Sequence, residues 1–383
     1  MPTIIHDQHG FHDNLTPTPL VKETIKIIAD QVSDKFPNEI NLVADGTWLD
    51  SPKSYDNLKE IYLQVPRIDN FFIVGTVDKI HTYGINYPSN PDLKLFQIGT
   101  ICDDYFHPYR LEWGIWSAVK LFKKYTDEEL KLFYSPNIKP YICYQNKPHL
   151  HRQQLTYKLL KEGLLDKGII TLKKNPGEEF IYPELTELSV EEFIERQYYL
   201  HPNEYIDPFF EKQIPYSLGE LKYWQNSFLN VVSETFANDG TTPYITEKTV
   251  KPILGLRPFI INGNYRIERQ LYQRAVIIYD FLWKLGVPLE EWITDDNDKI
   301  VDNCVKVIKN LCSWSNQEIY NYYRNDLYKV CLSNRDHLIG LANDTEIKMR
   351  NIFKNFTRYS LPNQNQEFVE KNLYKLQENG INI

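Results

Sequence analysis

An acidic and a basic residue, Glu247 and Lys248, stand side by side where a short helix is expected to begin. Thr246, directly before them, suits the N-cap position of that helix. The first turn of a helix presents N–H groups that lack intrahelical partners, and it carries about half a positive charge. A lysine in that turn is opposed by roughly 0.3–1 kcal/mol unless an anion binds beside it. The residue types and their order therefore indicate an anion-binding site, with a nucleotide phosphate as the first candidate.

A second basic residue, Arg152, stands in the equivalent place of another strand–helix pair, after an expected strand at 141–144. Two cations placed in this way can hold a diphosphate from both sides. The simpler alternative is a solvated arginine and a solvated lysine. Glu247 is likewise open to three roles, since it can pair with Lys251, cap its own helix, or accept hydrogen bonds from ribose hydroxyls.

The composition of the chain is that of an acidic globular protein. Its 383 residues, 42% hydrophobic and 25% charged, suit two domains. A net charge of −8 argues against a general nucleic-acid coat protein, which needs a basic face. The five cysteines include no CxxC pair, which indicates reduced thiols. We expect a cytoplasmic protein (in the host cytoplasm for a viral chain), because neither an apolar signal region nor a membrane-length apolar run is found in the sequence.

Strand-like and helix-like segments alternate twice along the chain, which predicts two doubly wound α/β domains with a cleft between them. Expected strands lie at 40–44, 60–65, 71–74, 95–98, 141–144, 168–172 and 258–262, with another ending at Ser233. Expected helices lie at 21–32, 112–125, 152–162, 264–285, 297–311 and 316–331. Residues 1–20, rich in His and Pro, are expected to be irregular. The expected parts are an N-terminal domain at 1–136, a C-terminal domain at 137–334, and a helical tail at 335–383 that packs back on the domains.

The segment from Glu234 through Tyr244-Ile-Thr-Glu-Lys248 resembles the donor-binding signature of the α1,3-fucosyltransferase family. The stretch Cys143–Arg152 is similar to an arginine-bearing element of the same domain in that family. Residues 140–310 as a whole also resemble a broad group of uncharacterised glycosyltransferase-like proteins from viruses and bacteria. The resemblance implies a GT-B fold, in which two Rossmann-like domains face each other across a cleft. The C-terminal domain would bind a nucleotide-sugar and the N-terminal domain an acceptor.

The resemblance also implies roles for single residues. In the family the glutamate of the motif binds the donor ribose, and the lysine and the arginine contact the diphosphate, which here gives those roles to Glu247, Lys248 and Arg152. The expected donor-binding residues are Arg152, Ser233, Glu234, Thr246, Glu247 and Lys248, of which Ser233 and Glu234 would line the floor of the pocket. The donor would be a UDP- or GDP-sugar. After Lys248 the chain continues Thr249-Val-Lys-Pro252, where the fucosyltransferases have Leu-Trp-Arg-Asn. The resemblance therefore does not identify the transferred sugar, which is a hexose or a pentose.

Inverting glycosyl transfer needs a base that removes the proton of the acceptor hydroxyl. Carboxylates at strand ends of the N-terminal domain are the candidates, with Asp45 first, then Asp78 and Asp69. Each of them also suits an ordinary turn. No metal is expected, since Asp103-Asp104 lacks the one-residue spacing of a metal-binding acid pair, and the acidic run from Asp295 lacks the glycine of a calcium loop.

The acceptor is a glycan or, alternatively, a hydroxylated base in viral DNA. Lys120, Lys123, Lys124 and Lys131 could line a groove for DNA, although a solvated helix face is the commoner explanation. A hypothesis from another class is a non-catalytic protein that binds a nucleotide-sugar and has the same fold. It would bind the donor without hydrolysing it or transferring its sugar.

Overall fold

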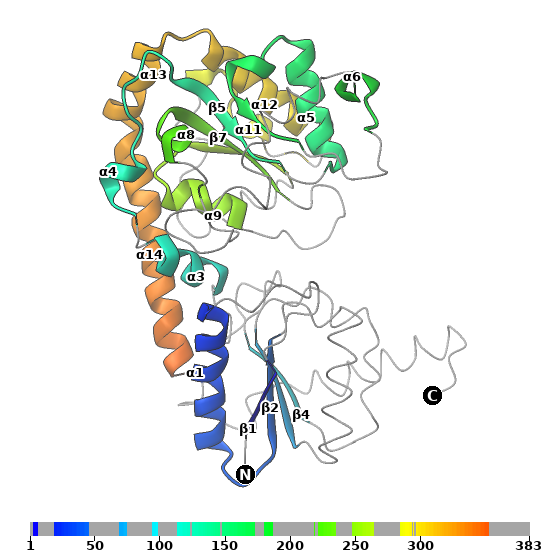
Figure 1. Ribbon diagram of the computed structural model, residues 1–383, viewed down its shortest axis with the longest axis vertical. Helices are drawn as coiled ribbons and strands as arrows, with labels where there is room; N and C mark the ends of the chain where they lie inside the picture. Colours follow the sequence, from blue (N-terminus) through cyan, green and yellow to red (C-terminus); the bar gives the residue numbers. More distant parts are fainter. Residues whose placement is uncertain are drawn as a thin grey trace, which may run out of the picture. The chain divides into compact units, whose positions relative to one another are not determined.

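A computed structural model describes residues 3–6, 19–45, 69–74, 94–98, 113–122, 125–145, 148–172, 180–186, 218, 221–234, 247–263, 284–292, 294 and 296–351. These residues form an α/β structure with two four-stranded parallel sheets (Figure 1). The chain divides into two compact units, the first comprising Met1–Trp113 with Asn343–Ile383 and the second Gly114–Ala342. The limits expected from the sequence, at 136/137 and 334/335, differ from this division and stay predictions.

The sheet of the first unit contains its strands in sequence order. They are β1 (Thr3–His6), β2 (Asn41–Asp45), β3 (Asn70–Val74) and β4 (Lys94–Ile98). All neighbours are parallel, and Val43 of β2 pairs with Ile5 of β1 and Phe72 of β3. Parallel pairing brings the carboxyl ends of all four strands to one edge of the sheet, and Asp45 is the last residue of β2 at that edge.

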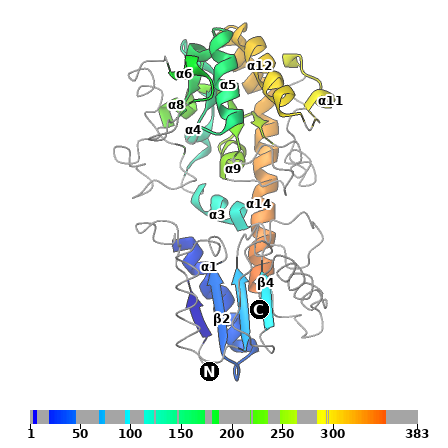
Figure 2. The same cartoon turned by 90° about the vertical axis from the view of Figure 1, so that its right-hand side faces the viewer.

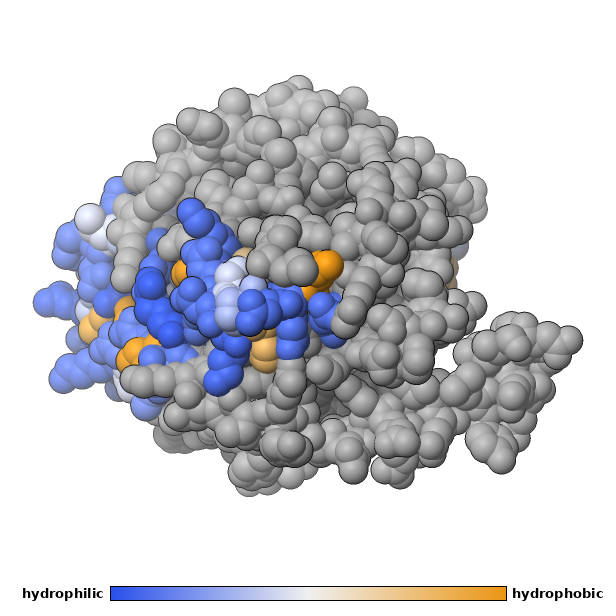
Figure 3. All heavy atoms as spheres, turned by 90° about the horizontal axis from the view of Figure 1, so that it is seen from below, coloured by the Kyte–Doolittle hydropathy of each residue, from blue (hydrophilic) through white to orange (hydrophobic). Residues whose placement is uncertain are grey.

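Helix α1 (Pro19–Lys35) connects β1 to β2 and packs on both strands. Its exposed residues Lys26, Asp30 and Asp34 recur at four-residue spacing, which places them on one face. In Figure 3 the described residues seen from below are mainly hydrophilic. The buried face of α1 consists of Ile25, Ile28, Ala29 and Val32.

The expectation that residues 1–20 are irregular is wrong for the described part of that segment. Thr3–His6 forms the edge strand β1, and α1 already begins at Pro19. The strand is held by ladder bonds to β2 and by the Ser33 hydroxyl of α1, which donates to Thr3 Oγ1 at 2.6 Å. Two isoleucines are too short a run to show a strand period, so only pairing with a distant partner reveals the strand.

The sheet of the second unit has the order β6-β5-β7-β8. Its strands are β5 (Lys139–Cys143), β6 (Ile169–Ile170), β7 (Ser227–Ser233) and β8 (Phe259–Asn262). All are parallel, and every residue of the central strand β7 is buried, as expected for a strand covered on both faces. The chain runs outward from β5 to β6 and in the opposite direction from β7 to β8. The winding therefore reverses between β5 and β7, which makes this point the topological switch point of the sheet.

Helices α5 (Leu150–Lys161) and α12 (Asn297–Cys312) pack side by side in the second unit, as Figure 2 shows. Lys158 pairs with Asp302 at 2.7 Å, and Glu162, one turn later, pairs with Lys309 at 2.5 Å. The partners advance together along both helices, so the two helices run parallel. These ion pairs are largely exposed and each contributes little to stability.

The second unit contains further short elements around its sheet. They are α4 (Asp127–Leu130), η1 (Leu165–Lys167), α6 (Pro183–Thr186), α8 (Leu221–Gln225), α9 (Glu247–Leu254) and α11 (Leu289–Trp292). Helix α3 (Trp113–Phe122) precedes them. After α12 the chain continues as α13 (Asn316–Tyr322), the π-helical turn η3 (Tyr323–Leu327) and α14 (Tyr328–Arg350). The expected limit at 334/335 falls within α14.

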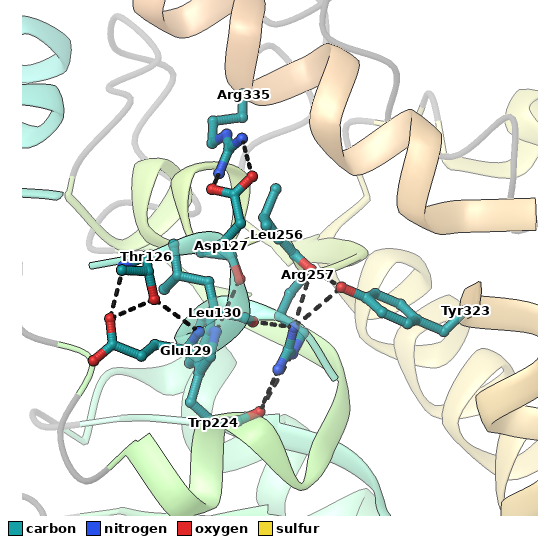
Figure 4. A network of polar contacts seen from close by, with 10 residues as sticks. Thr126, Asp127, Glu129, Leu130, Trp224, Leu256, Arg257, Tyr323 and Arg335 are labelled. Atoms are coloured by element: carbon teal, nitrogen blue, oxygen red, sulfur yellow. Dashed lines mark hydrogen bonds and ion pairs between the residues drawn. The ribbon is translucent and has the colours of Figure 1, made fainter. Parts of the chain in front are cut away.

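The guanidinium of Arg257, between α9 and β8, is fully buried and joins several of these elements (Figure 4). It donates to the main-chain carbonyls of Leu130 at 2.6 Å, Trp224 at 2.8 Å and Ser227 at 3.0 Å, in α4, α8 and β7. Its central carbon lies 5.6 Å from the ring centroids of both Trp224 and Tyr323. A buried charge needs such bonds to replace water, so Arg257 fixes these elements relative to one another.

Two neighbouring contacts extend this network. The Tyr323 hydroxyl of η3 donates to the carbonyl of Leu256 at 3.0 Å. Arg335 of α14 donates from Nη1 and Nη2 to the two carboxylate oxygens of Asp127 in α4, at 2.5 and 2.9 Å (Figure 4). The hydrogen bond from Arg335 holds the pKa of Asp127 below its ordinary value. Side chains thus attach η3 to the loop before β8 and α14 to α4.

Gly255 directly follows the last residue of α9, and packing requires a glycine at this position. The left-handed residue after the helix is Leu256, with φ of 56°, although a glycine usually takes that position. Gly255 is instead required by packing, because a Cβ there would lie 2.4 Å from Cζ2 of the buried Trp224 ring. This contact holds the end of α9 against α8.

We predict that Gly255→Ala lowers the free energy of unfolding by roughly 1–3 kcal/mol, because the added methyl overpacks against the Trp224 ring. The matched control is Gly340→Ala in α14, where an added Cβ meets nothing within 4 Å. This control is expected to stabilise the protein by roughly 0.5–1 kcal/mol through helix propensity. Urea unfolding of both variants measures the effect, and equal shifts in both would contradict the packing explanation.

Candidate functional site

The candidate site lies at the carboxyl edge of the second sheet, at the switch point between β5 and β7. Ligands of open α/β sheets bind outside the carboxyl ends of the strands at this point. Buried polar residues stand at three of these strand ends: Gln145 lies two residues after β5, Ser233 is the last residue of β7, and Asn262 is the last residue of β8. Among the six expected donor-binding residues, Arg152, Ser233 and Glu234 are brought together at this edge.

The three strand ends are bonded to one another through side chains. The Ser233 hydroxyl donates to Gln145 Oε1 at 3.1 Å and accepts from Asn262 Nδ2 at 3.2 Å. Gln145 in turn donates from Nε2 to Thr156 Oγ1 of α5 at 3.0 Å, and its main-chain N–H donates to Thr171 Oγ1 at 2.9 Å. All five side chains are buried. The network holds the ends of β5, β7 and β8 and the middle of α5 in fixed positions relative to one another, and it lines this edge of the sheet with polar side chains.

The first turn of α5 is tied to the end of β7. Arg152 Nη2 donates to the carbonyls of Ser233 and Glu234, both at 3.0 Å, and the Arg152 side chain is 2% exposed. His151 Nε2 lies 2.8 Å from the Glu234 carbonyl, so this nitrogen carries the proton and donates it. Asn262 Nδ2 also donates to the carbonyl of His151, at 3.2 Å. Arg152 therefore holds the first turn of α5 against the end of β7, and it also places a positive charge beneath the carboxyl edge of the sheet.

His151 is a neutral imidazole in this environment. Burial, reinforced by the positive charge of Arg152, lowers the pKa of His151 to about 3. The hydrogen bond to the Glu234 carbonyl opposes this shift but is outweighed. A histidine with such a pKa does not act as an acid–base group near neutral pH, so its contribution is positional.

The Cys143 thiol at the end of β5 is also inert. Burial raises the pKa of Cys143 to about 12, although contacts with Ser233 and Arg152 act in the opposite direction. Its sulfur lies 3.8 Å from Ser233 Oγ. A fully buried, protonated thiol is a packing group, so this cysteine is no nucleophile.

Helix α9 begins at Glu247, directly after the expected N-cap Thr246. Lys248 is its second residue and half-buried, and Thr249, fully buried, donates from Oγ1 to Glu234 Oε1 at 2.5 Å. This bond brings the start of α9 to the end of β7. Thr246 and the side chain of Glu247 lie outside the described residues, so their expected roles stay predictions.

The candidates for the catalytic base in the first unit differ in the edge of the sheet at which they lie. Asp45 ends β2 at the carboxyl edge, and its side chain lies outside the described residues, as does all of Asp78. Asp69 precedes β3 and therefore lies at the amino edge. Its Oδ2 accepts from the N–H of Ile40 at 2.9 Å, and its own N–H donates to the Ile40 carbonyl at 2.9 Å. Asp69 thus joins the amino ends of β2 and β3, on the side of the sheet opposite to the carboxyl edge.

Several residues of this site were not identified from the sequence. They are Gln145, His151, Thr156, Thr171, Thr249 and Asn262. A signal existed for some of them, since Gln145 and Asn262 directly follow or end apolar strand runs, where parallel strands deliver polar groups to the functional edge. The threonines carry no such signal, because their partners are distant in sequence.

No group of three or more His, Cys, Asp or Glu residues able to hold a metal occurs in the part of the chain that the structure describes. Within that same part, none of the helices combines the length and the apolar character needed to cross a membrane.

Comparisons with protein-family models, with curated protein sequences and with solved structures find no match to this chain. The likeness of residues 140–310 to glycosyltransferases therefore stays an expectation from the sequence. The parallel sheet, its switch point and the buried contacts at its carboxyl edge are the observations on which a function can be based.

The depressed pKa of His151 predicts a pH dependence of stability. Between pH 7 and about pH 3 the unfolded chain takes up a proton at this histidine and the folded chain does not, so stability falls as pH falls below about 6.5. From pH 7 to pH 5, the wild type should lose about 1–2 kcal/mol more unfolding free energy than His151→Gln. Urea unfolding at both pH values measures this. An identical pH dependence in the two proteins would show that His151 is not buried neutral.

Proposed function

We propose that this chain is a glycosyltransferase of the GT-B type, which binds the diphosphate of a UDP- or GDP-sugar at the carboxyl edge of the second sheet. The observation that carries the proposal is the strand order β6-β5-β7-β8. It puts the switch point between the two strands that precede the fucosyltransferase-like residues. Arg152 follows β5, and Glu234, Glu247 and Lys248 follow β7.

The two cations would act differently on the diphosphate. Lys248, half-buried in the first turn of α9, is the candidate for direct contact, together with the N–H groups of that turn, which have no acceptor within the helix. Arg152 is buried and bonded to the carbonyls that end β7. In this proposal it supplies positive charge from beneath and holds the strand end, and direct contact with phosphate would require it to leave those carbonyls.

The reaction would be an inverting transfer. A carboxylate, with Asp45 as the candidate, takes the proton of the acceptor hydroxyl, and the oxygen attacks the anomeric carbon of the donor sugar. The bond from that carbon to the diphosphate breaks, and the charge developing on the diphosphate is stabilised by Lys248 and the helix N-terminus. The acceptor-binding role of the first unit rests on the resemblance, and the acceptor is a glycan or a hydroxylated base of viral DNA.

Calorimetry with UDP and GDP tests the donor site. Lys248→Ala should weaken binding at least about tenfold, since hydrogen bonds to charged groups contribute roughly 1.5–3 kcal/mol. The matched control is Lys251→Ala, which removes a half-buried lysine one turn further along α9 and should leave the affinity within about twofold. Equal losses in both variants, or unchanged binding by Lys248→Ala, would contradict the assignment.

Turnover distinguishes an enzyme from a binding protein with this fold. Incubation with a panel of UDP- and GDP-sugars, followed by mass spectrometry, should detect slow donor hydrolysis for one member, and Asp45→Asn should reduce transfer to the matching acceptor more than it reduces donor binding. A protein that binds a nucleoside diphosphate tightly but hydrolyses no donor would instead be a non-catalytic nucleotide-sugar-binding protein.

A further inference from the structure

Glu234 is a carboxylic acid buried at the carboxyl edge of the second sheet. It directly follows the last residue of β7 and is 1% exposed. Taking a carboxyl group out of water costs free energy unless hydrogen bonds replace the water. The hydrogen-bond partners of the Glu234 side chain therefore indicate its structural role.

Thr249 supplies such a partner from α9. Its hydroxyl donates to Glu234 Oε1 at 2.5 Å, and its side chain is fully buried. Thr249 is the third residue of the helix, so the bond joins its first turn to the end of β7. First-turn residues are the ones for which intrahelical bonds are missing. A side-chain bond at this point therefore stabilises the part of α9 most prone to fraying.

The main chain of Glu234 is fixed independently of its side chain. Its N–H donates to the Asn262 carbonyl at 3.3 Å, and its carbonyl accepts from His151 at 2.8 Å and Arg152 at 3.0 Å. Gly263 allows a close approach, because a Cβ there would lie 3.2 Å from the Glu234 Cβ. Glu234 is thus a fixed point relative to which α9 can be oriented.

The rotation of α9 about its axis determines where Lys248 lies. Successive side chains of an α-helix are about 100° apart, given its 3.6 residues per turn. With Thr249 turned inward to Glu234, Lys248 must lie about 100° away, and it is indeed half-buried where Thr249 is fully buried. Losing the Thr249 bond would free this turn to fray and would displace Lys248.

We infer that Glu234 and Thr249 form a positioning pair, which holds the first turn of α9 so that Lys248 meets the donor diphosphate. The inference rests on the proposed function for the role of Lys248. The pair acts through the helix, and neither side chain needs to touch the ligand. This role differs from the pocket-floor role expected for Glu234 from the sequence.

Thr249→Val and Thr249→Ser test the pair, because valine keeps the shape and removes the donor, whereas serine keeps the donor. In the unliganded protein, hydrogen exchange of the amides of Lys251 and Ile253, whose helical acceptors are the first-turn carbonyls of Glu247 and Thr249, should be faster in Thr249→Val and near wild type in Thr249→Ser. Calorimetry with UDP and GDP should show about tenfold weaker binding by Thr249→Val, with the affinity restored in Thr249→Ser. If the valine variant does not fold, Thr249→Cys, a weaker donor of similar size, replaces it.

The two readouts separate the possible failures. Unchanged exchange in Thr249→Val overturns the pair whether or not nucleotides bind, and so does a serine variant that behaves like valine. Faster exchange with unchanged nucleotide affinity overturns the positioning role. Absence of UDP and GDP binding by the wild-type protein overturns the proposed function, and faster exchange in Thr249→Val would then still support the structural bond between Glu234 and Thr249.

Discussion

Polar side chains at the carboxyl edge of the second sheet are removed from water, and buried polar groups are tolerated only when they are hydrogen-bonded. Ser233 meets this requirement by bonding to Gln145 on one side and Asn262 on the other. Because those residues belong to the ends of three strands, satisfying them also fixes the strands relative to one another. A network of this kind rigidifies a site when all of its members are paired.

The helices that approach this edge depend on the same network. The first turn of α5 is attached through His151 and Arg152, and the first turn of α9 through Thr249. The other end of α9 is held by Trp224 of α8, whose Nε1 donates to the carbonyl of Gly255 at 2.9 Å, and by the main-chain N–H of Arg257, which donates to the carbonyl of Pro252 at 2.9 Å. A helix fixed at both ends loses little conformational freedom when a ligand binds at its start, and such preorganisation favours affinity.

The sequence allowed much of the fold to be predicted, because apolar strands and amphipathic helices are local patterns. The strands expected at 40–44, 71–74 and 95–98 agree with β2, β3 and β4 to within a residue at each end. The helix expected at 297–311 agrees with α12 in the same way. The edge strand β1 was not predictable, since its evidence is pairing with a distant strand.

The sequence was sufficient to predict where the candidate site lies, but only some of the contacts within the site. Arg152 was recognisable as a cation at a helix start, yet its burial against Ser233 and Glu234 depends on where β7 lies in space. The need for a glycine at 255 likewise depends on tertiary packing, because the Trp224 ring that excludes a side chain there belongs to another helix. Local sequence gives the chemistry of each side chain, whereas tertiary packing decides which atoms remain available.

The central claim is that the carboxyl edge between β5 and β7 binds a nucleoside diphosphate. Hydrogen exchange of the wild-type protein, measured with and without saturating UDP or GDP, tests it most directly. We expect one of the two nucleotides to protect the first turns of α5 and α9, at 150–152 and 247–249. Protection confined to other parts of the chain, or none with either nucleotide, would contradict the claim.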